Sequence, residues 1–137
     1  MSGVRGIVAL LALAGCIGTG EPPEDLPDRP PFPPENAQYL GSQTRLLDSD
    51  LVNFLVEMRG ARDGRDAGAY ARCVAAQYAL IRGYGFARHI RTIASQEGGV
   101  WRGDAVYTVS PALPPGKRTL DAEIEVARCR EDGIPLI

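Results

Sequence analysis

Seven prolines lie between Ile17 and Asn36, and this segment confines any folded domain to the remainder of the chain. It has almost no apolar periodicity, so it favours an extended polyproline II conformation over a packed element. Five acids face a single base, Arg29, which gives the segment a net charge of −4. We therefore expect an acidic, proline-rich tether over residues 16–36 and one compact domain over residues 37–137. The stretch 29–34 also has the form of a PxxP docking ligand, although a plain spacer is the simpler interpretation.

The residues before the tether have the parts of a bacterial export signal. Arg5 supplies a positive charge ahead of the apolar run Ile7–Leu13, and the small residues Ala14 and Gly15 precede Cys16. The apolar run is too short to cross about 30 Å of hydrocarbon as a helix. We therefore predict a signal peptide over residues 1–15. The alternative is an ordinary signal peptide that happens to contain a cysteine.

The sequence Leu13-Ala14-Gly15-Cys16 resembles the lipobox of bacterial lipoproteins. In that family the cysteine thiol receives a diacylglycerol, a peptidase cleaves just before the cysteine, and the new amino group is usually acylated. The resemblance implies a lipid anchor on Cys16, which two or three acyl chains would make nearly permanent. An aspartate after the cysteine commonly retains Gram-negative lipoproteins at the inner membrane. Ile17 at that position implies the outer membrane, with the domain facing the periplasm.

Hydrophobic periodicity predicts one main helix and four strands in the domain. The helix is expected from Asp66, its predicted N-cap, to about Arg82, with Gly83 as its left-handed end. The strands are expected at residues 51–58, 86–93, 101–109 and 120–127. In the last of these, apolar and acidic residues alternate, which favours a strand. A helix over residues 119–130 is the alternative, because glutamate and alanine favour helices.

The order β-α-β-β-β predicts an α+β fold. We expect a small antiparallel or mixed sheet of about four strands, with one main helix packed on one face. Once Cys16 carries a lipid, Cys73 and Cys129 remain as an even pair in an oxidising compartment, so we predict a disulfide between them. It would join the middle of the helix to the end of the last strand. Two separate buried thiols are the alternative.

His89 is the one histidine of the chain, and several arginines lie near it in the sequence. An anion-binding site for phosphate or carboxylates is one hypothesis, formed by Arg82, Arg88, His89, Arg91 and Arg102. A structural histidine is the simpler one, because no motif supplies a nucleophile or a positioned carboxylate. No metal-binding or cofactor-binding motif is present, so we predict no catalytic residues, no metal and no cofactor. The domain has thirteen bases and twelve acids, without the basic stripe that nucleic-acid binding needs.

The block Ala69–Phe86 loosely resembles small uncharacterised envelope lipoproteins of Gram-negative bacteria, in which a strand is followed by such a helix and by further strands. The resemblance implies the same layout and no catalytic motif. The sequence therefore favours a membrane-anchored, non-enzymatic module that binds or scaffolds an envelope protein or a cell-wall component. A small periplasmic enzyme, or an anion-binding protein that uses His89 and the nearby arginines, is the alternative.

Overall fold

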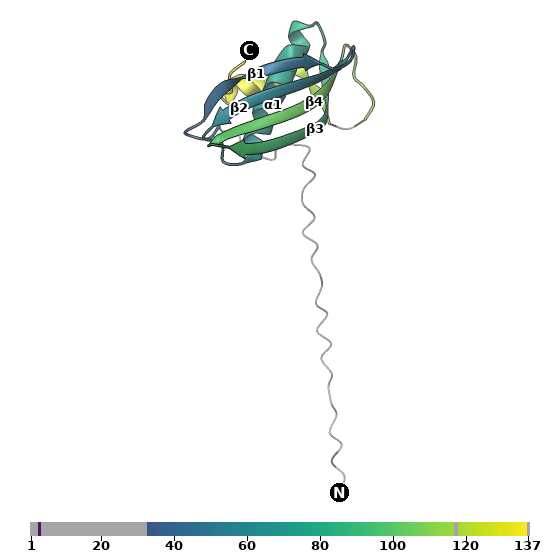
Figure 1. Ribbon diagram of the computed structural model, residues 1–137. Coiled ribbons are helices and arrows are strands. Elements are labelled where there is room, and N and C mark those ends of the chain that lie inside the picture. The colour runs from purple at the N-terminus through teal and green to yellow at the C-terminus, as the bar shows by residue number, and fades with distance from the viewer. Residues whose placement is uncertain (1–2, 4–32, 117, 137) are drawn as a thin grey trace.

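The computed structural model describes Gly3, residues 33–116 and residues 118–136. The predicted signal peptide, Cys16 and the tether up to residue 32 lie outside these described residues. The chain forms β1 (Gln38–Leu46), β2 (Leu51–Arg59), α1 (Gly64–Ile81), β3 (Phe86–Glu97), β4 (Val100–Ser110), β5 (Thr119–Asp121) and α2 (Ala122–Glu131). Figure 1 shows the strands as one layer and α1 behind them as a second layer. None of the described helices is long and apolar enough to span a membrane.

The five strands form one sheet in the order β1-β2-β4-β3-β5, and every neighbouring pair is antiparallel. Helix α1 connects β2 to β3, which lie on either side of β4. The predicted α+β class is confirmed, with five strands and two helices where we expected about four strands and one main helix. The unpredicted strand, β1, forms an edge of the sheet.

The core lies between the sheet and the helices, and β2 supplies its largest fully buried side chains. Val52, Phe54, Val56 and Met58 alternate along β2 and are fully buried, as the period-two pattern predicted. The facing side of α1 carries mostly alanines, which allow the helix to approach the sheet closely. At Gly103 of β4 the approach is so close that an added Cβ would lie 3.1 Å from the carbonyl oxygen of Ala67.

Helix α1 begins at a different cap from the predicted one. Asp63 is the N-cap, and its carboxylate accepts a hydrogen bond from the backbone N–H of Arg65 at 2.8 Å. Asp66 lies in the first turn, where its buried carboxylate accepts bonds from the backbone and the guanidinium of Arg62. Asp66 therefore fixes the chain that enters the helix, from the third helical position that a capping box also uses, although it bonds to the residue before the N-cap. Gly83 has the expected positive φ, 81°.

The predicted strand over residues 120–127 is wrong. Only Thr119–Asp121 pair with β3, and a helix, α2, begins at Ala122. The Asp121 carboxylate caps it by accepting from the backbone N–H groups of Glu123 and Ile124 at 3.1 and 3.2 Å. The buried residues follow helical spacing, namely Ala122, Glu125, Val126 and Cys129. The alternating pattern predicted the wrong face for two residues: Ile124, expected in the core, is exposed, and Glu125, expected outside, is buried.

A disulfide joins Cys73 of α1 to Cys129 of α2, with the two sulfurs 2.06 Å apart. Both cysteines are fully buried. The bond therefore connects two helices, and not a helix to the end of a strand as the sequence suggested. It holds α2 against α1 on the same side of the sheet.

Candidate binding surface on the uncovered sheet face

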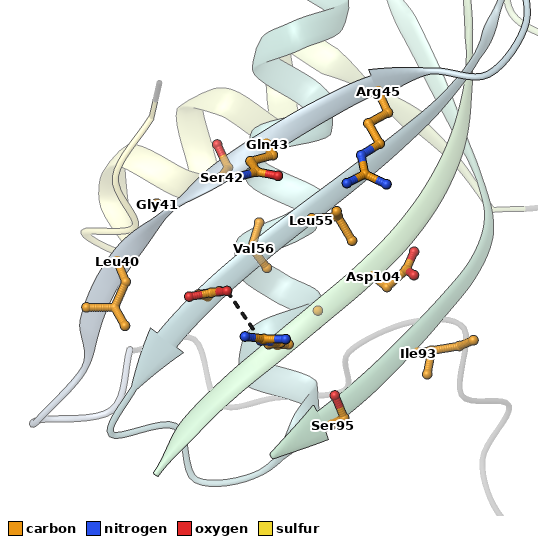
Figure 2. Close-up of a pocket in the computed structure, with 13 residues that line it drawn as sticks. Leu40, Gly41, Ser42, Gln43, Arg45, Leu55, Val56, Ile93, Ser95 and Asp104 are labelled. Atoms are coloured by element: carbon orange, nitrogen blue, oxygen red, sulfur yellow. Dashed lines mark ion pairs between the residues drawn. The ribbon is translucent and has the colours of Figure 1, made fainter. Parts of the chain in front are cut away.

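One face of the sheet is covered by α1 and α2, and the other carries an open groove of about 630 Å³ (Figure 2). The groove crosses all four long strands. Its lining includes the apolar residues Leu40, Leu55 and Ile93 and the polar or charged residues Gln43, Arg45, Glu57, Ser95, Arg102 and Asp104. This mixture of apolar surface and a few charged groups is typical of a binding surface.

Hydrogen bonds and ion pairs hold three of the four charged side chains of the groove in place. Asp104 of β4 accepts a 2.6 Å hydrogen bond from the Asn53 amide and lies 3.3 Å from the Arg91 guanidinium. A second pair joins Arg102 Nε to Glu57 Oε1 at 3.3 Å. Because these groups are partly exposed, each ion pair contributes at most about 1 kcal/mol to stability. Their larger effect is to fix the positions of charges on the surface.

Positive charge exceeds negative charge on this face. On the four long strands β1–β4, the registers place the side chains of five arginines there, against three acids: Arg45, Arg59, Arg88, Arg91 and Arg102 against Glu57, Glu97 and Asp104. Among the residues that the structure describes, Arg45 forms no ion pair, and Figure 2 shows its guanidinium directed toward the groove near Leu55. A carboxylate in the groove would give Arg45 a counter-ion and could bind it through two hydrogen bonds.

The structure does not bring together all five residues of the predicted anion site. Arg88, Arg91 and Arg102 share the uncovered face. Arg82 is the C-cap residue of α1, and its guanidinium lies 5.8 Å from the centre of the Tyr78 ring. His89 projects into the covered face and does not line the groove. A site that combines His89 with these arginines is therefore not assembled.

His89 belongs to a polar cluster beneath the helices. A bulge at Ile90 shifts the register of β3, so that His89 and Thr92 lie on the same face. His89 Nε2 is 2.7 Å from Thr92 Oγ1, and the imidazole packs edge-on against the Tyr107 ring at 5.1 Å. Burial raises the pKa of the Tyr107 hydroxyl well above its ordinary value, so this tyrosine stays neutral. Within the described residues, no three histidine, cysteine, aspartate or glutamate side chains form a metal-binding group.

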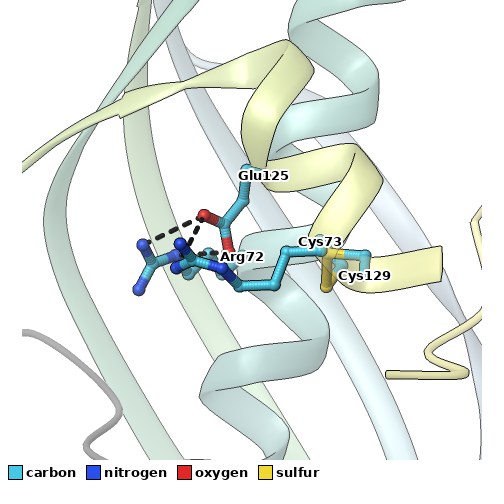
Figure 3. Close-up of a disulfide and its surroundings, with 5 residues drawn as sticks. Arg72, Cys73, Glu125 and Cys129 are labelled. Carbon is cyan, nitrogen blue, oxygen red and sulfur yellow. Dashed lines mark hydrogen bonds and ion pairs between the residues drawn. A yellow bond between two sulfur atoms is a disulfide. The ribbon is translucent and has the colours of Figure 1, made fainter. Parts of the chain in front are cut away.

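A nearby buried ion pair links the two helices beside the disulfide (Figure 3). Arg72 Nε lies 2.9 Å from Glu125 Oε1, and a second guanidinium nitrogen donates to Oε2 at 3.2 Å. Arg128 reaches the same carboxylate at 3.8 Å from the solvent side. These contacts explain why an acidic residue is tolerated on the inner side of α2. The covered face therefore contains the groups that hold the helices together, and the uncovered face contains the exposed groove.

Arg45, Asn53, Glu57 and Asp104 were not among the residues predicted from the sequence. Arg45 lies on β1, whose residues alternate too weakly in hydrophobicity to predict a strand. The segment Asp48-Ser49-Asp50 between β1 and β2 is a turn signal, and it could have indicated a hairpin. The pairing of Asp104 with Asn53 depends on the β2–β4 register, which joins residues far apart in the sequence.

The YNQ4 C-terminal domain family matches residues 39–133, which include both helices and every strand except the first residue of β1. The chain belongs to this family. It is 32% identical over 110 residues to an uncharacterised 26.9 kDa protein of Paracoccus denitrificans, described by its location in the nqo8 5′ region. The similarity covers 76% of this chain and only 43% of the Paracoccus protein. No solved structure matches the chain.

Proposed function

We propose that this YNQ4 C-terminal domain is a lipid-anchored, non-enzymatic module of the bacterial cell envelope. Its binding surface is the groove on the uncovered sheet face, and its partner is an envelope protein that presents a carboxylate. The observation that carries the proposal is Arg45, a guanidinium directed into an exposed groove with no ion pair among the described residues. Apolar residues beside Arg45 would contact the carbon atoms of the same partner.

The lipobox residues support the anchor in this proposal, with Cys16 as the acylated residue and the outer membrane, facing the periplasm, as the location. The tether would separate the domain from the bilayer by roughly 50–60 Å if it is extended, at about 3.1 Å per residue. Two separate experiments test the anchor and the groove.

The anchor is tested by expressing the full chain in a Gram-negative bacterium that is fed an alkyne-labelled fatty acid. The wild-type chain should incorporate the label and sediment with the outer membrane. Cys16→Ser should lose the label because it lacks the thiol, whereas Cys73→Ser should retain it. Label on Cys16→Ser, or its absence from the wild-type chain, would contradict the anchor.

The groove is tested by placing a photo-crosslinking amino acid at Ile93 or at Ile124 of the full chain in living cells. These isoleucines are 58% and 59% exposed, but Ile93 lines the groove and Ile124 lies on α2. We expect a discrete adduct from Ile93 and not from Ile124, and we expect Arg45→Glu to remove it. Equal adducts from both positions, or no loss with Arg45→Glu, would refute the proposed surface. A cell-wall peptide adduct at Ile93 would replace the protein partner.

A further inference from the structure

One free edge of the sheet is formed by β1, which among the described strands pairs only with β2. The backbone N–H of Leu47 donates to the carbonyl of Leu51 on the β2 side at 2.8 Å. Since backbone groups alternate in direction along an antiparallel strand, those of Gln43 and Arg45 also point toward β2. The backbone N–H and C=O groups of Ser42, Thr44 and Leu46 therefore point outward, away from the sheet.

This edge has few of the features by which sheets avoid pairing with other chains. Such features include lysines, prolines and bulges on the edge strand. In β1 there is one bulge, between Tyr39 and Gly41, and the half from Ser42 to Leu46 is regular. This half contains no proline and one charged side chain, Arg45, and it ends at Leu46, which is 55% exposed. The regular half of β1 is thus an available template for another strand.

Side chains on the two faces of this edge define what such a strand would contain. Arg45 lies on the groove face, whereas Leu46, the next residue, lies on the helix-covered face. A strand paired with β1 would therefore place one residue beside Arg45 and its chain neighbour beside Leu46. A negatively charged side chain beside Arg45 and an apolar side chain beside Leu46 would both be favourable.

We propose that Ser42–Leu46 binds an extended segment of a partner protein by strand addition, and that this segment alternates acidic and apolar residues. The acidic side chain pairs with Arg45, and the apolar side chain covers Leu46. This mode of recognition combines main-chain hydrogen bonds for affinity with side-chain contacts for specificity. The inference rests on the binding role proposed for the uncovered face, and it names the way in which the partner enters the site.

The test uses the full chain carrying Cys16→Ser, labelled with ¹⁵N, and two short acetylated peptides. In the first peptide, every second residue is valine and the residues between are threonine, except for one central glutamate. In the second peptide, lysine replaces that glutamate. Backbone amide shifts are followed during titration. We expect the glutamate peptide to shift the amides of Ser42, Thr44 and Leu46, with the lysine peptide about two- to fivefold weaker.

Two variants separate main-chain pairing from charge. Thr44→Pro removes one outward N–H without removing a β1–β2 bond, and it should weaken the glutamate peptide about fivefold. Thr44→Val is the matched control, because it keeps the N–H and a β-branched side chain, and it should bind as the parent does. Arg45→Glu should reverse the preference, so that the lysine peptide binds more tightly than the glutamate peptide.

Unchanged binding by Thr44→Pro, or no shift of β1 amides with either peptide, would overturn strand addition. Shifts confined to groove residues such as Leu55 would also overturn it, while leaving the groove itself in place as a binding surface. Concentration-dependent β1 shifts without peptide would show that a second copy of the chain occupies the edge, which refutes the acidic partner. The crosslinking at Ile93 is measured independently, so failure of the proposed function is distinguishable from failure of this inference.

Discussion

Removing the disulfide by changing Cys73 and Cys129 to alanine should lower the free energy of unfolding by about 4 kcal/mol. The bond closes a loop with a sequence separation of 56 residues, and its loss returns that loop's conformational freedom to the unfolded chain. The chain-entropy relation for a loop of this length gives about 4.2 kcal/mol at 25 °C. For a domain of about 100 residues, this corresponds to a fall in Tm of roughly 15–30 °C.

The assay is urea denaturation of the full chain carrying Cys16→Ser, with and without the two alanine substitutions. Far-UV circular dichroism reports the helices. The fluorescence of Trp101, the one tryptophan, reports the sheet. The m-value should rise in the variant, because an unfolded chain without the cross-link exposes more surface. The wild-type chain in a reductant strong enough to open the bond is the second comparison.

A loss below about 1 kcal/mol, with the m-value unchanged, would refute the loop-entropy reasoning. It would mean that the unfolded chain retains structure that already restricts the loop. A different pattern would locate the effect in the native state. If the helical signal decreased before Trp101 fluorescence changed, the disulfide would be holding α2 in place and the two-state treatment would fail.

Two further predictions concern the covered face. Gly103→Ala should destabilise the domain by about 1–3 kcal/mol in urea denaturation, because the new methyl group would lie 2.9 Å from the Val56 side chain. Gly85→Ala is the control and should cost much less, because no atom lies nearer than 3.9 Å to its new methyl group. Equal losses of stability in the two variants would refute the packing argument. Burial raises the pKa of Asp66, but hydrogen bonds and charge from Arg62 outweigh it and hold the pKa below the ordinary 3.8. Its stabilisation is therefore full above that value and is lost as the pH falls through the lowered folded pKa. Asp66→Asn should flatten the acid limb of the stability–pH curve, and an unchanged acid limb would contradict this assignment.

The elements that the sequence predicted well are those in which one face is buried and the other is not. In β2 the apolar residues alternate with period two, and in α1 the buried residues repeat with helical spacing before a glycine of positive φ. For such segments the local pattern and the tertiary environment agree. Their boundaries in the structure differ from the prediction by only a few residues.

In α2, the local sequence pattern was not enough to predict the secondary structure. The segment 120–127 alternates as a strand would. The buried residues of α2 nevertheless follow helical spacing: Ala122, Val126 and Cys129 are small or apolar, and the fourth, Glu125, is acidic. From the sequence alone, a glutamate predicts a solvent-exposed position, even where a basic partner allows it to be buried. Its partner, Arg72, lies 53 positions earlier in the chain, so the correct period could not be recognised from the segment alone.

The candidate site was missed for a related reason. An edge strand such as β1 is exposed on most of its length, so its sequence carries little alternation. The pairing of Asp104 with Asn53, and the orientation of Arg45, depend on strand registers rather than on any local motif. The anion site predicted from the sequence, which combined Arg82, Arg88, His89, Arg91 and Arg102, is not assembled as one site. Three of the five residues chosen, Arg88, Arg91 and Arg102, do lie on the uncovered face.

The fold separates the groups that stabilise it from the groups that it exposes. The disulfide, the Arg72–Glu125 pair and the close contact at Gly103 all lie on the helix-covered side of the sheet. The groove and the outward edge of β1 lie away from them, and the ion pairs there are partly exposed and contribute little to stability. Substitutions at Arg45 or Thr44 should therefore change binding while leaving the urea midpoint nearly unchanged.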